Sequence, residues 1–238
     1  MMMRLDKYLA EMGIGTRTEV KKLIRQGKIE VDGEVTTKPE QKIEPTVQKI
    51  YCNGKQIEYT NYEYYMLHKP AGVVSATFDK NEKTVMDLIK MKKRKDLFPV
   101  GRLDKDTEGL LLITNDGALA HNLLSPKKHV DKVYYVKVRG RLTQEDVIQF
   151  ERGFSIGNGE VVKSSILDIV ESADISDACV TIQEGKYHQV KRMFAAVGKK
   201  VIYLKRLSMG NLWLDEDLPI GEYRPLTEEE LQELKESC

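Results

Sequence analysis

The spacing of apolar residues predicts a chain built from short helices and short strands. Near the N-terminus, Leu5, Leu9 and Met12 follow the helical period, and a second helix is predicted to begin at Thr16-Arg17-Thr18-Glu19. That tetrapeptide has the form of a capping box, in which the threonine hydroxyl accepts the amide of the third helical residue and the glutamate reaches back. Asp32-Gly33 is then a turn signal between two short strands. We therefore expect the first 60 residues to form a small domain of their own.

From residue 64 onward, short apolar runs alternate with short helical patterns, which is typical of a mixed sheet with helices packed on it. In residues 132–139 the alternation is strict, and Tyr134, Val136 and Val138 form the more apolar face. We expect this face, with Tyr134, to point inward. The other predicted strands span residues 64–68, 159–170, 178–183, 200–207 and 211–214, and the predicted helices span 84–90, 118–124, 143–150, 187–197 and a last one beginning with a second capping box at Thr227.

The composition, 41% hydrophobic and 32% charged over 238 residues, is that of a soluble globular protein with one or two cores. No apolar run approaches the roughly 20 residues that span a bilayer, and the N-terminus lacks the apolar core of a signal peptide. We therefore expect a cytoplasmic protein that does not contact a membrane. Cys52, Cys179 and Cys238 form no C-x-x-C pair and the four histidines form no ligand pair, so neither a disulfide nor a metal site is expected.

The net charge of +1 hides a strong asymmetry. Residues 215–238 contain nine acidic residues against two basic ones, a net charge of −7, which leaves +8 for the first 214 residues. Five cations between Arg17 and Lys28 accompany a single acid, Glu19, on the predicted second helix and just after it. A basic body is compatible with a nucleic-acid partner, although a solvated helix face gives the same pattern. A second basic run, Lys90–Lys95, is predicted to be an exposed loop.

The stretch from Val100 to Ile113 contains the strongest candidate for chemistry, Asp104, just before an apolar run too short to form a helix of its own. Residues 104–109 superficially resemble the start of a calcium loop, but the twelfth position, which should be a bidentate glutamate, is Asn115. A glycosidase pair with Asp106 or Glu108 is a second possibility, but it lacks a tryptophan-rich sugar platform.

The remaining interpretation makes Asp104 a lone carboxylate that reacts or stabilises charge. Burial raises the pKa of such a group, so it needs a fixed cation nearby to stay ionised. Arg102, Lys186, Lys191 and Arg192 are the candidates, and Lys191 is the best placed because it is adjacent to the apolar stripe of its predicted helix.

These stretches resemble the motifs of the pseudouridine synthases. Gly101-Arg102-Leu103-Asp104 with Thr107-x-Gly109-Leu110-Leu111 looks like the catalytic motif, and Lys132-Val133-Tyr134 looks like the tyrosine motif, with Val133 in place of the commoner threonine. Glu184–Met193 is similar to the basic third motif and Lys69-Pro70-x-Gly72 to the first, while the N-terminal helix pair and hairpin resemble an S4 RNA-binding domain. Residues 187–198 and 221–227 favour the branch named small-subunit (16S) ribosomal RNA pseudouridine synthase A.

The resemblance implies an α+β fold, with an S4-like domain in residues 1–60 and a catalytic domain with a mixed, mainly antiparallel sheet in residues 61–238. It implies an isomerase without a cofactor that converts a uridine of small-subunit ribosomal RNA to pseudouridine. Asp104 would attack or assist at the sugar or the base of an extruded nucleotide, Tyr134 would stack on the uracil, and Lys191 would pair with Asp104, although Arg192 could serve instead. Arg102 could enter the RNA stack where the base had been.

The implied partner is ribosomal RNA or a small-subunit assembly intermediate, bound by a monomer. The expected RNA contacts are mainly phosphate-binding cations, namely Arg4, Lys7, Arg17, Lys21, Lys22, Arg25, Lys28, Arg102, Lys186, His188 and Arg192. Two alternatives stay open: a large-subunit ribosomal RNA pseudouridine synthase, and a non-catalytic RNA-binding protein of ribosome assembly.

Overall fold

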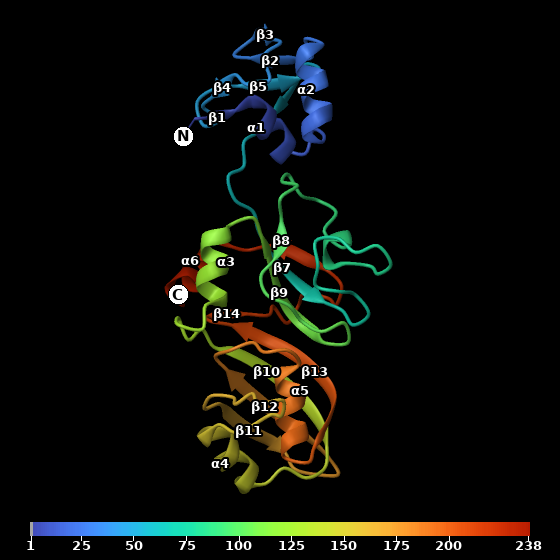
Figure 1. Ribbon diagram of the computed structural model, residues 1–238, viewed down its shortest axis with the longest axis vertical. Helices are drawn as coiled ribbons and strands as arrows, with labels where there is room; N and C mark the ends of the chain where they lie inside the picture. The colour runs from blue at the N-terminus through green and yellow to red at the C-terminus, as the bar shows by residue number, and fades with distance from the viewer. Residues whose placement is uncertain (1) are drawn as a thin grey trace. The chain divides into compact units, whose positions relative to one another are not determined.

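The computed structural model describes residues 2–238, and the contacts within it divide the chain into two units (Figure 1). The first unit runs up to Glu63 and also includes Lys90–Leu97, and the second comprises Tyr64–Ile89 and Phe98–Cys238. None of the helices within residues 2–238 combines the length and apolarity that crossing a bilayer requires.

The first unit consists of two helices against short strands, as the apolar pattern predicts. Its elements are β1 (Met3–Arg4), α1 (Leu5–Glu11), α2 (Arg17–Arg25), β2 (Ile29–Val31), β3 (Glu34–Thr36), β4 (Lys42–Ile43), β5 (Ile50–Cys52) and β6 (Lys55–Ile57). An antiparallel sheet has the order β3-β2-β5-β6, and β1 pairs with β4. Leu5, Leu9, Val20 and Ile24 are fully buried in the core of this unit. The expected capping box forms at the start of α2, where the Thr16 amide donates to the Glu19 carboxylate at 2.7 Å.

The segment Lys90–Leu97 packs within the first unit, and the prediction of a wholly exposed loop is wrong for Arg94. This side chain is only 4% exposed. Its Nη2 lies 3.0 Å from Glu11 and 2.5 Å from Asp96, and the Glu63 carboxylate accepts the Arg94 amide at 2.8 Å. Carboxylates contributed by α1 and by residue 63 therefore hold a segment that is distant in sequence.

The second unit is built on a nine-stranded sheet. Its main path is β11-β12-β10-β13-β9-β7-β15, with β14 on β13 and β8 on β9. The strands are β7 (Tyr64–Lys69), β8 (Phe98–Pro99), β9 (Glu108–Thr114), β10 (Lys132–Arg139), β11 (Ile166–Glu171), β12 (Ile175–Ile182), β13 (Lys200–Met209), β14 (Leu212–Trp213) and β15 (Tyr223–Pro225). All pairs are antiparallel except β13 with β9, so the sheet is mixed and mainly antiparallel, as expected.

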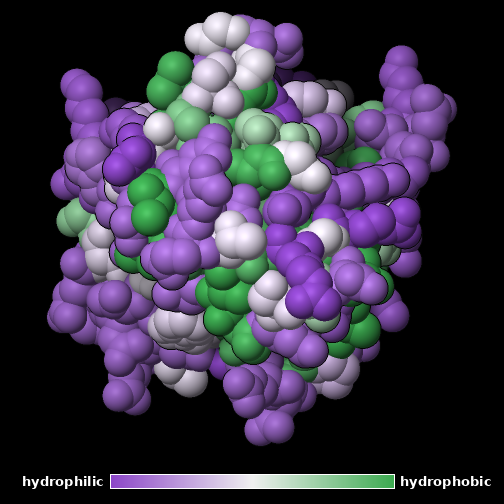
Figure 2. Space-filling view, turned by 90° about the horizontal axis from the view of Figure 1, so that it is seen from below, coloured by the Kyte–Doolittle hydropathy of each residue, from purple (hydrophilic) through white to green (hydrophobic). Residues whose placement is uncertain are grey.

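Helices cover the sheet in two groups. α4 (Gln144–Arg152) and α5 (Gln189–Ala196) pack on each other through Phe150 and Phe194, whose ring centroids are 5.1 Å apart. They lie with β10–β13 in the lower part of Figure 1. α3 (Gly117–Leu124) and α6 (Glu228–Glu236) contribute Leu119 and Leu234 to a second core with β7 and β9. The face shown in Figure 2 is mostly hydrophilic, with small hydrophobic patches between hydrophilic side chains.

Two predicted elements are shorter in the structure. Residues 84–90 form only a 3-10 turn over Val85–Asp87, in which the Asp87 carboxylate accepts the Thr84 amide at 2.7 Å. Of the strand predicted over 159–170, only Ile166–Glu171 pairs in the sheet, and Asn158 and Gly159 before it have positive φ. In β10 the prediction is confirmed: Tyr134, Val136 and Val138 are buried.

Candidate active site

Asp104 lies in a turn whose backbone carbonyls bind a buried lysine. Lys69, at the end of β7, is fully buried, and its Nζ donates to the carbonyl oxygens of Asp104 at 3.0 Å and Thr107 at 2.8 Å. It also donates to the carbonyl of Pro70 at 3.0 Å. Burial lowers the pKa of Lys69 to about 8, because a charged group loses its water there. The ammonium group thus fixes the backbone that carries the carboxylate.

The other end of this turn is fixed by close packing at Gly109. Here β9 joins β13 in the parallel pairing, with Glu108 opposite Lys205 and Gly109 opposite Arg206. Gly109 has φ +106, and a Cβ at this position would collide with the backbone of Arg206. Only glycine allows the two strands to approach this closely.

Lys191 on α5 meets Asp104 from across the pocket. Its Nζ lies 2.9 Å from Asp104 Oδ2 and 2.6 Å from Asp106 Oδ1. Burial opposes the charge of Lys191, but hydrogen bonds to Asp106 and Asp104 outweigh it and raise the pKa of the ammonium. The same bond lowers the pKa of Asp106. The ammonium is therefore a permanent cation shared by two carboxylates, Asp104 and Asp106.

His188 also borders the carboxylate. Its Nε2 lies 3.5 Å from Asp104 Oδ1, and its backbone is left-handed, with φ 50 and ψ 33, at the residue that precedes α5. A left-handed conformation is uncommon for a residue other than glycine and often marks a functional position. The residue expected only among the RNA contacts therefore lies beside the candidate reacting group.

A pocket contains all three predicted catalytic residues. Asp104, Tyr134 and Lys191 line it together with apolar side chains that include Val190 and Leu204. Tyr134 points into this pocket from β10 and is 8% exposed, whereas the Asp104 side chain is 25% exposed. A partly buried carboxylate, the ammonium group paired with it and an aromatic ring thus line one pocket, and this combination suits a planar substrate.

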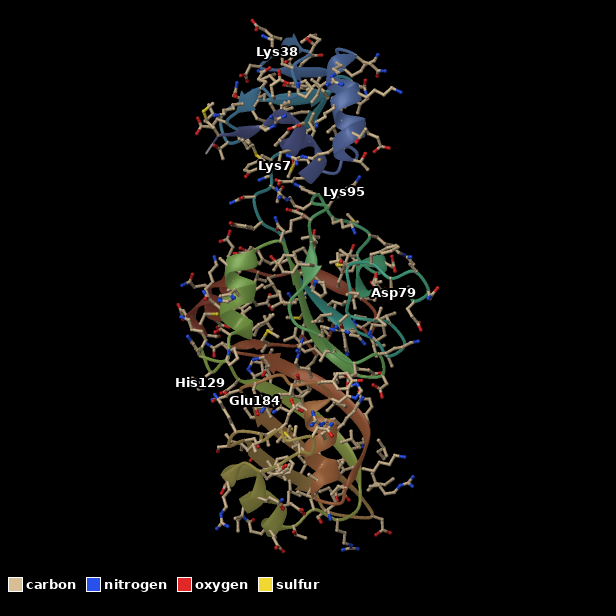
Figure 3. The ribbon with its side chains drawn as sticks, viewed as in Figure 1. Lys7, Lys38, Asp79, Lys95, His129 and Glu184 are labelled. Atoms are coloured by element: carbon tan, nitrogen blue, oxygen red, sulfur yellow. The ribbon has the colours of Figure 1, made fainter. Side chains whose placement is uncertain are left out.

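The cations expected to contact RNA near this pocket differ in their exposure and in their pairing with carboxylates. Arg102 is exposed and lines the pocket. Lys186 also lines the pocket. Its Nζ lies 3.1 Å from the carboxylate of Glu184, which is labelled in Figure 3, and donates a hydrogen bond to the Val161 carbonyl. Arg192 pairs with Glu160, and its guanidinium donates to the Gly157 carbonyl at 3.0 Å. Its contact with RNA stays a prediction, and it is Lys191, not Arg192, that pairs with Asp104.

The expected RNA contacts of the first unit lie on and near its helices. Arg4 binds Asp6 through two hydrogen bonds of 3.0 Å, and Lys21 Nζ lies 3.9 Å from the same buried carboxylate. Lys7, labelled in Figure 3, lies 3.6 Å from Glu11. The remaining expected contacts are all exposed: Arg17, Lys22, Arg25 and Lys28.

Two site residues were not assigned a role from the sequence. Lys69 was recognised only as part of a motif, because no periodicity signals a lysine that binds carbonyl oxygens of a distant turn. Thr107 is 1% exposed and lines the pocket, and its place depends on the fold of the turn. Within residues 2–238, no group of three or more His, Cys, Asp or Glu side chains is arranged to hold a metal ion.

The fold and the pocket define an RNA-modifying enzyme with a separate RNA-binding unit. Residues 63–196 match the family model described as RNA pseudouridylate synthase, and residues 3–49 match the S4 domain. The chain belongs to the RNA pseudouridylate synthase family and is a pseudouridine synthase that acts on RNA.

Relatives match along nearly the whole chain. An uncharacterized RNA pseudouridine synthase of Bacillus subtilis is 48% identical over 98% of this chain and 99% of its own. Ribosomal small subunit pseudouridine synthase A of Escherichia coli K12 is 38% identical over 96% of this chain and 98% of its own. A crystal structure of a pseudouridylate synthase, 36% identical, superposes with a TM-score of 0.68 and covers 98% of this chain and 99% of that one.

Proposed function

We propose that this protein isomerises a specific uridine of small-subunit ribosomal RNA to pseudouridine, with Asp104 as the nucleophile. The observation that carries the proposal is the pairing of Asp104 with Lys191 at 2.9 Å in a pocket walled by Tyr134. The small-subunit target is supported by the Escherichia coli relative, a ribosomal small subunit pseudouridine synthase A that is 38% identical to this chain.

The chemistry requires an ionised carboxylate next to a base that has left its stack. Isomerisation breaks the N-glycosidic bond, turns the uracil and rejoins it through carbon, with no net redox change. Lys191 places its ammonium group 2.9 Å from Asp104, and Tyr134 stacks on the uracil inside the pocket. A paired base cannot reach this pocket, so the uridine must be extruded at a cost of a few kcal/mol.

Contacts to the RNA backbone offset the cost of extrusion. Residues 1–60 hold the RNA through the exposed cations of α2, and residues 61–238 carry out the reaction. Arg102, exposed at the pocket, occupies the gap left in the RNA stack. We further propose that the protein acts as a cytoplasmic monomer on ribosomal RNA or on an assembly intermediate of the small subunit.

The test is to map pseudouridines in the ribosomal RNA of cells that lack the protein and of cells that carry it or a variant. Restoration of one small-subunit pseudouridine by the wild-type chain is expected, with none restored by Asp104→Asn. Asp174→Asn is the matched control, because the Asp174 side chain is fully exposed.

Each outcome addresses one part of the proposal. Normal modification by Asp104→Asn contradicts the role of the carboxylate. A pseudouridine restored in the large subunit instead contradicts the target. If the protein binds RNA but forms no pseudouridine in either ribosomal RNA or its precursors, the alternative of a non-catalytic RNA-binding protein of ribosome assembly is supported.

A further inference from the structure

The segment before α5 presents an aromatic ring at the rim of the pocket. Tyr187 is 76% exposed, and its ring stacks on that of His188, with centroids 3.8 Å apart and planes at 20°. His188 lines the pocket beside Asp104, whereas Tyr187 is not among the residues that line it. The three side chains therefore form a series that runs from the carboxylate, through the imidazole, to a tyrosine ring that faces outward.

The surrounding hydrogen bonds hold this pair of rings in place. Gln189 is buried, and its side chain accepts the amide of Lys186 at 2.9 Å and donates to Glu184 at 3.0 Å. The Arg192 guanidinium donates to the Tyr187 carbonyl at 3.3 Å. An exposed ring that is stacked and anchored by its backbone loses little conformational freedom on binding, which favours a recognition role.

The charges around the rings match RNA rather than an apolar partner. Arg102, Lys186 and Lys191 line the same pocket as His188. Proteins that bind unpaired RNA combine cations for the phosphates with aromatic rings on which bases stack. Because His188 covers one face of the Tyr187 ring, a base would stack on the other face.

We propose that Tyr187, backed by His188, is the stacking platform for the RNA base next to the uridine in the pocket. The inference rests on the proposed function and deepens it by naming a residue that senses the neighbouring nucleotide. Extruding a uridine exposes the faces of its neighbours, and a tyrosine ring at the pocket rim replaces the stacking that one of them loses. The hydroxyl group is not needed for this role, but the ring is.

The first test measures single-turnover kcat/KM on a short RNA that contains the target uridine, using the full chain. Tyr187→Ala should lower kcat/KM about 10-fold, the typical loss when one base–aromatic stack is removed. Tyr187→Phe should retain the wild-type value because it keeps the ring. Trp213→Ala is the matched control, because Trp213 is also exposed, at 57%, and does not line the pocket.

The second test replaces each nucleotide beside the target with an abasic one. At one position, the abasic RNA should lower kcat/KM for the wild type by the same factor as Tyr187→Ala, and the variant should lose nothing further. Equal losses for the wild type and Tyr187→Ala at both positions would overturn the proposal, as would full activity of Tyr187→Ala on intact RNA. These results would leave the ring as a contact for something other than RNA.

A binding measurement separates this inference from the proposed function. The same RNA carries 2-aminopurine beside the uridine and is mixed with the Asp104→Asn protein, which is expected not to turn it over. If the Asp104→Asn protein quenches the 2-aminopurine fluorescence and the double variant Asp104→Asn/Tyr187→Ala does not, the platform is supported, even if the wild type forms no pseudouridine. If both proteins quench the fluorescence equally and the wild type forms pseudouridine, the stacking platform is overturned while the proposed function stands.

Discussion

At the scale of single residues, the site depends on how two lysines are placed. Lys191 is partly exposed and paired, so its pKa is raised and its charge is permanent. Lys69 is fully buried among carbonyl oxygens, so its pKa is lowered. Lys191 forms an ion pair with the carboxylate of Asp104, and Lys69 binds the backbone carbonyl of the same residue.

Replacing Lys191 tests the charge. We expect Lys191→Met to lower kcat about 10- to 100-fold, because a hydrogen bond to a charged group contributes about 1.5–3 kcal/mol. Lys200→Met, which removes an exposed lysine of β13, should leave kcat unchanged. Rates are measured as pseudouridine formed per enzyme on the target RNA. An undiminished kcat in Lys191→Met would show that the pair does not act in the reaction.

Replacing Lys69 tests the burial of its charge through the pH dependence of stability. The folded-state pKa of about 8 is below the ordinary value of 10.5, so between these pH values the unfolded chain binds the proton that the folded chain releases. The stability of the wild type relative to Lys69→Met should therefore rise from pH 8 to 10.5, by at most about 3 kcal/mol. Urea unfolding of both proteins across this range measures the difference. A constant difference would mean that the lysine titrates normally.

At the scale of elements, β9 determines where Asp104 is placed. The strand pairs antiparallel with β7 on one side and parallel with β13 on the other, so the turn before it is held at both edges. The parallel contact depends on Gly109, whereas Gly117, at the start of α3, has open space around it. The two glycines make a matched pair of substitutions.

Gly109→Ala should destabilise the protein by about 3 kcal/mol or more and abolish activity, because the new Cβ meets the Arg206 backbone at a strained φ. Gly117→Ala should be neutral or stabilise by up to about 1 kcal/mol, since it adds a good helix former without a clash. Chemical denaturation and pseudouridine assays measure both. If the two variants were equally stable, the close approach of β9 and β13 would not be essential.

At the scale of the whole molecule, the division into units does not follow the sequence simply. Lys90–Leu97 interrupts the sequence of the second unit and packs in the first, where Arg94 is buried against Glu11. The boundary between residues 60 and 61, predicted from the sequence as the division between RNA-binding and catalytic domains, stays a prediction. The packing, by contrast, shows that the first unit includes a segment that follows part of the second unit in the sequence.

Arg94→Met should destabilise the first unit by about 3 kcal/mol, because breaking a buried ion pair leaves its carboxylates without compensation. Lys93→Met removes an exposed pair with Glu58 and should cost at most about 1 kcal/mol. Hydrogen–deuterium exchange should show faster exchange centred on α1, α2 and the strands packed on them in Arg94→Met. If exchange there matched the wild type, the buried pair would not stabilise the unit.

What the sequence determined by itself is mostly local. The capping boxes at Thr16 and Thr227 and the alternation in residues 132–139 were predicted correctly because their contacts lie within a few residues of each other. Asp104 and Lys191 were selected from motifs, which also indicated the family. The roles of these residues in the reaction stay predictions until they are tested.

Only the tertiary structure decided how distant residues meet. It placed Lys69 under the turn of Asp104, turned Arg192 toward Glu160, and buried Arg94. None of these follows from periodicity, because a cation has the same pattern in the sequence whether it faces water, RNA or a carboxylate. Its environment is set by chain segments far away in sequence, and the folded structure alone brings them together.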